Sequence, residues 1–398
     1  MKILGLIVEY NPFHQGHLHH INQAKAIVKP DLTIAIMSGN FVQRGEPAII
    51  SKFDRANIAV NHGCDLVVEL PLVCAVQSAN QFAQGAIKLL SEMQVTDIVF
   101  GSESGDIELF LDIATNLQES DEYHDLVKDF LKTGISYSDA CNQALQKLDM
   151  PSIASPNDLL GLAYTKEVVN NYPHINLHCI KRSNSYHEKT ITQIPSATSL
   201  RLGLYEKKNL EKILISPEHF CLDLFYLENL FPLLKYKLIT SSPANLAQIH
   251  LVDEGIENLM RKNIMACHSM HDFVNTLTSK RYSRSRIQRT IIHILLNNTR
   301  TDVNEALKLD YLRILKANSR GFSYLKKLRK ITGYKIITNF SSHSHPSLET
   351  ELKGATLLSM ISSTNDVHIR EIANKPGTTD TFMIALENKD NHQSLTNS

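Results

Sequence analysis

Short runs of apolar residues alternate with longer stretches of helical spacing through the first hundred residues. The apolar runs are rich in β-branched residues and have the length of buried strands; they lie at residues 3–8, 32–37, 66–70 and 95–100. The stretches between them predict helices at residues 18–28, 52–62 and 77–92. Alternating strands and helices are typical of βαβ units, so the pattern predicts an α/β fold with a parallel sheet.

Beyond residue 100 the pattern is mainly helical. Amphipathic helices are predicted over residues 106–148 with a break at 134–137, and a further helix begins near Ser155 or Asn157 as its N-cap. Another strand is predicted at 177–180, and helices at 203–280 (including 222–230 and 256–265), 285–296 and 349–360. The polar tail from residue 380 is expected to fray. We therefore predict a first domain at 1–202, a helical domain at 203–345, and a helical segment with a polar tail at 346–398.

The stretch that follows the first strand has the pattern of an anion site. A turn containing Asn11-Pro12 leads to His14, Gly16 and His17, and a helix follows. Backbone N–H groups and the dipole at a helix N-terminus favour an anion, a glycine allows close approach, and imidazoles can donate hydrogen bonds. The alternative is a surface turn with two incidental histidines, since the chain contains 18.

Two further loops should meet this stretch, because ligands bind at the carboxyl ends of parallel strands. One is the loop at 38–47, which carries Arg44 beside Gly45, and the other begins at Gly101. With Lys52, Asp54 and Arg55 on the next helix, the Arg44 loop could clamp a polyphosphate or a carboxylate. The alternative is a solvated loop at the start of a helix.

A second candidate anion site lies at residues 196–201, near the start of a predicted helix. Its sequence is Ser-Ala-Thr-Ser-Leu-Arg, which offers hydroxyls and the guanidinium of Arg201. A simple capping segment is the alternative.

Composition indicates an ordinary globular protein. A chain of 398 residues is expected to form two or three domains. Its six cysteines are scattered without a Cys-x-x-Cys pair, which favours reduced thiols and a cytoplasmic location over a disulfide scaffold or a zinc site. No apolar run is long enough to span a bilayer, and no signal-peptide pattern is present, so we expect no membrane partner. We assign no residue as a metal ligand.

Positive charge is concentrated at residues 280–330, although the net charge of the chain is zero. This segment contains fourteen basic and three acidic residues, which is typical of a polyanion site. Tyr282 and Tyr324 could stack on unpaired bases. The alternative is a solvated helical face, because apolar residues such as Ile287 and Ile291 recur behind the charges. The predicted RNA contacts are Lys280, Arg281, Arg284, Arg286 and Arg289.

The His14-x-Gly16-His17 motif and the Ser196–Arg201 stretch together resemble the nucleotidyltransferase superfamily, which includes adenylyltransferases and class I aminoacyl-tRNA synthetases. Three longer segments, at 5–17, 37–47 and 280–289, are similar to the bacterial tRNA(Met) cytidine acetate ligase family. That resemblance extends to about residue 370.

The resemblance implies a Rossmann-like nucleotidyltransferase domain followed by a mainly helical RNA-binding domain. It implies an ATP-dependent ligase that converts acetate to acetyl-adenylate and acetylates N4 of the wobble cytidine, position 34, of elongator tRNA(Met). His14 and His17 would be catalytic, ATP a cosubstrate, and Mg²⁺ would balance the triphosphate charge. The implied ATP contacts are Ile7, Val8, Glu9, Tyr10, Asn11, Pro12, Phe13, His14, Gln15, Gly16, His17, Leu18, His19, His20, Gly101, Asn157 and Arg182.

The chain departs from the family pattern at two places: Asp158 stands where a second asparagine is expected, and the residues after Arg182 are less rich in glycine. Two other functions remain as alternatives. A mononucleotide adenylyltransferase would need the first motif but not the basic segment, and a non-catalytic RNA-binding protein would need only the basic segment.

Overall fold

The computed structural model describes residues 1–117, 120–135, 137–151, 153, 155–182, 196–220, 223–363 and 366–377. Strands lie at Ile3–Val8 (β1), Leu32–Ser38 (β2), Phe41–Val42 (β3), Glu46–Pro47 (β4), Leu66–Leu70 (β5), Asp97–Ser102 (β6), Asn176–Lys181 (β7), Tyr311–Ala317 (β8) and Lys335–Ile337 (β9).

Helices of the first half lie at Gln15–Val28 (α1), Lys52–Asn61 (α2), Leu72–Ala75 (α3), Ala79–Glu92 (α4), Ile107–Asn116 (α5), Asp121–Lys132 (α6), Tyr137–Lys147 (α7), Pro156–Asn171 (α8) and Ala197–Tyr205 (α9). Those of the second half lie at Phe231–Thr240 (α10), Pro243–Leu246 (α11), Ile256–Asn263 (α12), Met270–Leu277 (α13), Arg284–Leu296 (α14), Arg300–Ala306 (α15), Ser319–Leu328 (α16), Pro346–Ser359 (α17) and Asp366–Ala373 (α18). Short 3₁₀ turns lie at Pro217–Phe220, Leu227–Leu230 and Phe340–Ser342.

The predicted parallel sheet is confirmed. Its strand order is β7-β6-β1-β2-β5-β8-β9, and the five strands from β7 to β5 run parallel. Numbered by their order along the chain, these five strands are arranged 3-2-1-4-5, like the first five strands of a Rossmann sheet, with β1 in the middle. The connection changes direction between β1 and β6, so the carboxyl ends of these two strands mark the crevice where such folds bind ligands.

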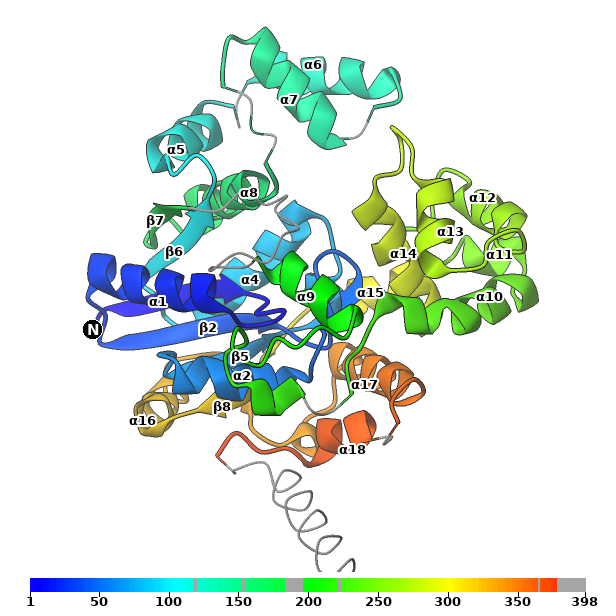
Figure 1. The fold of residues 1–398 in the computed structure, drawn as a ribbon. Helices are drawn as coiled ribbons and strands as arrows, with labels where there is room; N and C mark the ends of the chain where they lie inside the picture. Colours follow the sequence, from blue (N-terminus) through cyan, green and yellow to red (C-terminus); the bar gives the residue numbers. More distant parts are fainter. Residues whose placement is uncertain are drawn as a thin grey trace, which may run out of the picture.

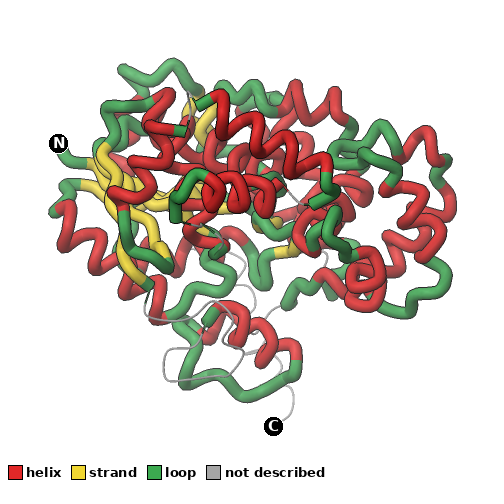
Figure 2. The backbone as a smooth tube through the Cα atoms, turned by 90° about the horizontal axis from the view of Figure 1, so that it is seen from above, coloured by secondary structure: helices red, strands yellow, loops and turns green. Residues whose placement is uncertain are grey.

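Two layers of helices cover the sheet (Figures 1 and 2). One face of β1 presents Leu4 and Leu6 to the apolar sides of α1 and α2. The opposite face of β1 presents Ile3 and Ile7, beside Ile34 of β2, to the cluster that contains α4 and α8. Because side chains alternate along a strand, β1 is apolar on both faces, which is why its sequence is a continuous apolar run.

The helices from α10 to α14 form a separate apolar cluster beside the sheet (Figure 1). As predicted, α14 is amphipathic: Ile287, Ile291 and Ile294 are buried in this cluster. Among the described residues of 222–230, the structure has a 3₁₀ turn rather than an α-helix. The predicted helices at 106–148 and 349–360 correspond to α5–α7 and α17.

One part of the expected helical domain is wrong. Residues 311–317 form β8, which pairs antiparallel with β5, and β9 follows it in parallel. The chain therefore leaves the helical cluster after residue 296 and returns to the sheet. The apolar positions of β8 were obscured in the sequence by Arg313 and Lys316, which we assigned to a basic surface. The polar tail from residue 380 lies outside the described residues.

No helix within the described ranges combines the length and apolarity of a membrane span. The five cysteines in those ranges, Cys64, Cys74, Cys141, Cys179 and Cys267, are free thiols.

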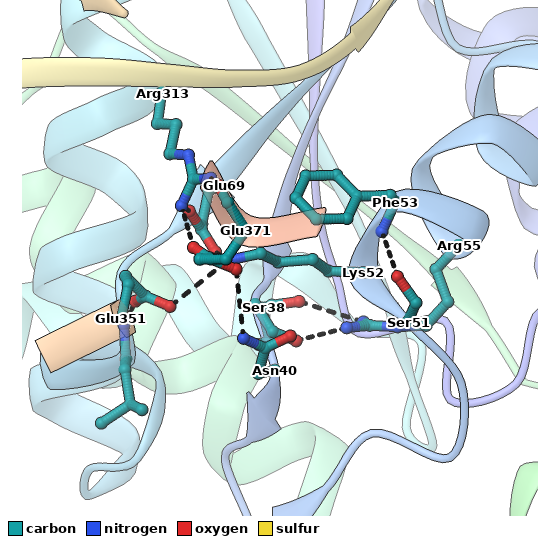
Figure 3. A network of polar contacts seen from close by, with 12 residues as sticks. Ser38, Asn40, Ser51, Lys52, Phe53, Arg55, Glu69, Arg313, Glu351 and Glu371 are labelled. Carbon is teal, nitrogen blue, oxygen red and sulfur yellow. Dashed lines mark hydrogen bonds and ion pairs between the residues drawn. The ribbon is translucent and has the colours of Figure 1, made fainter. Parts of the chain in front are cut away.

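A buried cluster of charges ties the last two helices to the sheet (Figure 3). Lys52 at the start of α2 is fully buried, with Nζ 2.5 Å from Oε1 of Glu69 on β5 and 2.8 Å from Oε1 of Glu371 on α18. Arg313 on β8 donates from Nη1 to Glu69 (3.0 Å) and from Nη2 to the carbonyl of Glu371 (3.0 Å). Removing one partner from such a cluster would cost about 3–5 kcal/mol, because a buried charge would be left unpaired.

Glu351 on α17 is the third carboxyl of this cluster, and its negative charge would be the least well balanced by nearby cations and hydrogen-bond donors. Its Oε2 lies 3.5 Å from Lys52 Nζ and accepts no hydrogen bond within the described part of the chain. Three carboxyls face two cations, so one proton on a carboxyl balances the charge. Burial, followed by the repulsion of Glu69, raises the pKa of Glu351 to about 8.

The Glu351→Gln variant should therefore change the pH dependence of stability. Between pH 4.5 and about 8 the folded chain holds a proton on Glu351 that the unfolded chain releases, so the wild type should lose stability as pH rises. Relative to Glu351→Gln, the free energy of unfolding should fall by up to about 1.4 kcal/mol per pH unit. Urea unfolding from pH 5 to 8 measures this difference.

Glu349→Gln changes an exposed glutamate on the same helix and serves as the control, with a pH profile like that of the wild type. Parallel profiles for the wild type and Glu351→Gln would contradict the assigned proton.

Candidate active site at the β1–α1 corner

The first helix begins at Gln15, three residues earlier than its apolar pattern predicted, because two histidines cap it. His14 is the N-cap, and its Nδ1 accepts a hydrogen bond from the backbone N–H of Gly16 (3.0 Å). In return, Nδ1 of His17 accepts from the backbone N–H of His14 (3.3 Å). This reciprocal arrangement is a capping box in which imidazoles replace the usual hydroxyl and carboxylate.

The caps determine the tautomer of both rings. A neutral imidazole has one acceptor nitrogen and one N–H, and here Nδ1 of each ring is the acceptor. The proton must then be on Nε2 of both His14 and His17. The two rings lie with their centroids 3.8 Å apart, so they present two neighbouring donors. Such a pair can bind oxygens of a phosphate group.

Burial keeps the histidines of this corner neutral. It lowers the pKa of His14 to about 4, helped by the positive charges of Arg182 and Arg201. The pKa of His17 is well below its usual value for the same main reason, with His14 and Arg182 contributing. Burial also lowers the pKa of His20, one turn further along α1, to about 4.

The structure changes the explanation for Gly16. A side chain there would meet the ring of His14, with Cε1 only 2.8 Å from the added carbon. The glycine therefore makes room for the capping imidazole, and its N–H is used by that cap. An anion at this corner would be bound by the Nε2–H groups and the helix dipole rather than by the Gly16 N–H.

The Ser196–Arg201 stretch reaches the same corner from the other end of the domain. Ser196 caps α9, accepting from the N–H of Ser199 (3.1 Å), as its composition predicted. Arg201 donates from Nη1 to the carbonyl of Asn11 (2.7 Å). Arg201 was noted in the sequence but was not among the predicted ATP contacts, and its place beside Asn11 makes it a member of the site.

Gly101 and Arg182 lie together at the ends of β6 and β7. The N–H of Arg182 donates to the carbonyl of Ser102 (2.8 Å). A side-chain carbon added at Gly101 would be in ordinary van der Waals contact with the Arg182 side chain. Because Arg182 also lowers the pKa values of His14 and His17, its charge lies near the two imidazoles. The residues that follow Arg182, 183–195, lie outside the described part of the chain.

Asn157 and Asp158 begin α8 and hold the loop after β6. Asn157 donates to Oε1 of Glu103 (2.6 Å). Oδ1 of Asp158, where the family pattern has asparagine, accepts from the hydroxyl of Ser102 and from the N–H of Glu103 (2.9 Å). A carboxylate suits this position, because its neighbours are all donors.

The predicted clamp on the second loop is only partly right. Lys52 and Arg55 are fully buried and bind protein groups, so they are not available to a polyphosphate. Arg55 donates to the carbonyls of Glu9 (2.6 Å), Ser38 (3.0 Å) and Gly39, and thereby joins the loops after β1 and β2. Asp54 is also buried, paired with Arg370 on α18 (3.0 Å).

Arg44 remains at the edge of this corner, and its charge helps to offset the effect of burial on Glu9. Burial raises the pKa of Glu9, while the N–H of Gln43, 2.7 Å from Oε1, and the charge of Arg44 act in the opposite direction.

The basic segment at 280–330 does not form one continuous surface. Arg313 is buried in the charge cluster, Arg300 donates to the carbonyl of Ala247 (2.6 Å), and Lys308 pairs with Glu305 (2.7 Å). The run of basic residues in the sequence does not become a basic patch on the surface, because β8 carries the middle of the run into the core.

The predicted stacking tyrosines are also wrong. Tyr282 is buried with its hydroxyl donating to the carbonyl of Glu254 (3.0 Å), and Tyr324 is buried with its hydroxyl donating to Met93 (2.6 Å). Neither ring is available to a base.

The arginines that begin α14 lie beside acidic groups of the 253–254 turn. Arg286 pairs with Asp253 and Glu254, and Arg281 pairs with Glu254 (3.2 Å). Arg284 and Lys280 are exposed, whereas Arg289 is half-buried.

One group of three acidic side chains within the described ranges could hold a metal: Glu69, Glu351 and Glu371. The ammonium of Lys52 already lies between them, at 2.5 to 3.5 Å from each. An internal cation therefore takes the place that a metal ion would occupy.

A Rossmann-type switch point, where two neutral imidazoles cap a helix beside two arginines, defines the class of protein: a nucleotidyltransferase. Accordingly, the family described as HIGH Nucleotidyl Transferase matches residues 1–371. A tRNA(Met) cytidine acetate ligase of Geobacillus sp. (strain WCH70) is 39% identical over 374 residues, covering 89% of this chain and 93% of the relative. A ligase of the same name from Staphylococcus aureus (strain JH9) is 36% identical, covering 91% and 96%. The chain belongs to the tRNA(Met) cytidine acetate ligase family.

Solved structures agree in fold. The crystal structure of apo Thermotoga maritima TmcAL superposes with a TM-score of 0.87 at 32% identity, covering 94% of this chain and 99% of that one. A second structure of the same protein, bound with alpha-thio ATP, superposes with a TM-score of 0.85.

The neutral state of the corner can be measured directly. In an NMR titration, the signal that disappears in His14→Gln should move with a midpoint near pH 4 rather than 6.5, because burial and two arginines disfavour the charged ring. The unfolded chain takes up protons between pH 6.5 and 4 where the folded chain does not, so this corner should lose stability as pH falls through that range.

The same protein in denaturant provides the control and should show the ordinary midpoint. A midpoint near 6.5 in the folded protein would mean that the ring is solvated and does not cap the helix.

Proposed function

We propose that this protein activates acetate with ATP as acetyl-adenylate and then acetylates N4 of cytidine 34 of elongator tRNA(Met), forming N4-acetylcytidine. The observation that supports this most strongly is the pair of imidazoles, His14 and His17, that cap α1 at the Rossmann switch point. Relatives at 36–39% identity along about nine-tenths of the chain are named as ligases for this reaction.

ATP would bind along the β1–α1 corner. The contacts we propose are residues 7–20, with Gly101, Asn157 and Arg182 at the neighbouring strand ends. Arg201 is added to this set, because it is fixed to the carbonyl of Asn11 in the middle of the corner loop. The triphosphate would then lie where two arginines and two Nε2–H donors meet.

In the first step an acetate oxygen attacks the α-phosphorus of ATP, the bond to the β-phosphate oxygen breaks, and pyrophosphate leaves. Negative charge grows on the phosphate oxygens in the transition state. His14 and His17 donate to these oxygens, and because they are neutral they do so without exchanging a proton. Correct placement of the carboxylate in line with phosphorus supplies much of the remaining rate.

In the second step the amine of the cytidine attacks the acetyl carbonyl, AMP leaves, and the amine loses a proton. The base must leave its stack to reach the corner. The RNA backbone would be held by Lys280, Arg281, Arg284, Arg286 and Arg289. Arg281 and Arg286 would exchange Asp253 and Glu254 for phosphates, which makes binding dependent on salt.

Mg²⁺ would arrive with ATP and balance the triphosphate charge. The free cysteines agree with the cytoplasmic location in which tRNA is modified. The two alternatives have weaker support, since the named relatives match the nucleotide corner and the helical part together.

His17→Ala should abolish most acetate activation. Removing one donor to a developing oxyanion costs about 10²–10³ in rate, so acetate-dependent exchange of pyrophosphate into ATP should fall by at least 100-fold. His174→Ala changes an exposed histidine of the same domain and should keep the wild-type rate. No exchange in the wild-type protein would rule out acetate activation.

Purified elongator tRNA(Met), incubated with the protein, ATP and acetate, should gain one acetyl group on cytidine 34. Mass spectrometry of the anticodon fragment measures the product, and omission of acetate is the control. Unmodified tRNA together with pyrophosphate exchange that does not depend on acetate would favour the adenylyltransferase alternative. Binding of tRNA with neither reaction would favour the RNA-binding alternative.

A further inference from the structure

A small hairpin connects the nucleotide corner to the basic helix α14. Strands β3 and β4 pair antiparallel, and Gly45 in their turn has φ +77°. A side chain at Gly45 would lie 2.3 Å from the backbone nitrogen of Arg289, so the turn packs directly on α14. Gln288 donates to Oε1 of Glu46 (3.0 Å) and fixes the contact.

The side chain of Arg289 projects from α14 into this contact, and its positive charge is poorly neutralised. Its Nη1 donates to the carbonyl of Gln43 at 3.4 Å, and its buried Nε has no partner within the described residues. It forms no ion pair with a described carboxylate. Burial and the nearby charges of Arg286 and Arg44 lower its pKa to about 10. A buried guanidinium with an unpartnered N–H is costly unless an anion or another acceptor joins it.

Two carboxylates of this hairpin and of the corner loop already accept hydrogen bonds from other groups. Oε1 of Glu46 accepts from Gln288, and Oε1 of Glu9 accepts from the N–H of Gln43 (2.7 Å). Gln43 therefore contacts both sides: its N–H binds the corner loop that carries His14, and its carbonyl binds Arg289. One residue of backbone joins the nucleotide corner to the half-buried guanidinium.

We propose that Arg289 forms a seat for a backbone phosphate of the RNA next to the target cytidine, and that the β3–β4 hairpin sets the distance from this seat to the nucleotide corner. This inference rests on the proposed function and makes Arg289 a positioning residue, distinct from the exposed arginines of α14. A guanidinium suits the role, because its forked donors bind two phosphate oxygens at once.

A phosphate is favoured over the acetate carboxylate by the location of the seat. Arg289 belongs to the helical part and contacts the loop after β2, whereas the charges that act on His14 and His17 come from Arg182 and Arg201. A flipped base and its flanking phosphate are separated by one sugar, so the phosphate is expected beside the corner rather than in it.

The Arg289→Gln variant tests this with two assays on the full-length protein. Acetate-dependent pyrophosphate exchange without tRNA should stay within twofold of the wild type. Acetyl transfer should show a KM for tRNA(Met) raised about tenfold, and the slope of log affinity against log salt should fall by about one unit. Arg289→Lys should restore part of the affinity, because it returns the charge without the fork.

Lys262→Gln removes an exposed charge from α12 and is the matched control, with both assays unchanged. If Arg289→Gln unfolds at lower urea concentration than the wild type, Arg289→Lys, which keeps the buried charge, replaces it, with the same expected pattern at smaller amplitude.

Four results would overturn the inference or its basis. Equal loss of exchange and transfer would make Arg289 structural. A raised KM for acetate in the exchange assay would assign the seat to the carboxylate. Unchanged tRNA kinetics would remove the seat altogether. A wild-type protein that acetylates no tRNA would instead refute the proposed function, whatever the variants do.

Discussion

The capping of α1 by two histidines is the interaction on which the rest of the site depends. One set of hydrogen bonds begins the helix, fixes both tautomers and directs the remaining protons to Nε2. An N-cap of this kind contributes about 1 kcal/mol to stability, which is modest. Its larger effect is on the chemistry of the site. The cap directs the ring protons to Nε2, and burial keeps both rings neutral at physiological pH, so that they can donate hydrogen bonds. The same residues thus serve the local structure and the proposed chemistry.

Other parts of the chain hold this corner in place from a distance. Arg55 joins the loops after β1 and β2 through three backbone carbonyls, and Arg201 holds the corner loop from α9. Both are arginines bound to carbonyl oxygens, an arrangement that satisfies buried backbone groups. Within the described residues, no carboxylate is among the charged groups that act on His14 or His17. A carboxylate beside the imidazoles would have raised their pKa values and changed the corner from neutral to cationic.

The charge cluster around Lys52 explains why the chain returns to the sheet after the helical part. Glu69 on β5 and Arg313 on β8 pair across two adjacent strands, while Glu371 closes the cluster from α18. Such a buried network contributes little net stability. It does specify register, since its charges balance only when β8 and α18 are both in place. The helical cluster is consequently attached to the sheet at both of its ends, and the β3–β4 hairpin makes a third contact at Gly45.

The sequence by itself determined the parallel sheet, the turn with His14 and His17 that joins its first strand to a helix, and the amphipathic helix at Arg284–Leu296. These follow from local periodicity and from residues adjacent in the chain, where spacing fixes geometry. Only the tertiary structure decided which charged side chains lie on the surface and which lie in the core. Lys52, Arg55 and Arg313 have the sequence signature of a polyanion site, yet each is buried against partners up to 319 residues away. Pairing over such separations leaves no periodic signal, so the strand at 311–317, the buried tyrosines and the link from Gln43 to Arg289 became visible only in the folded chain.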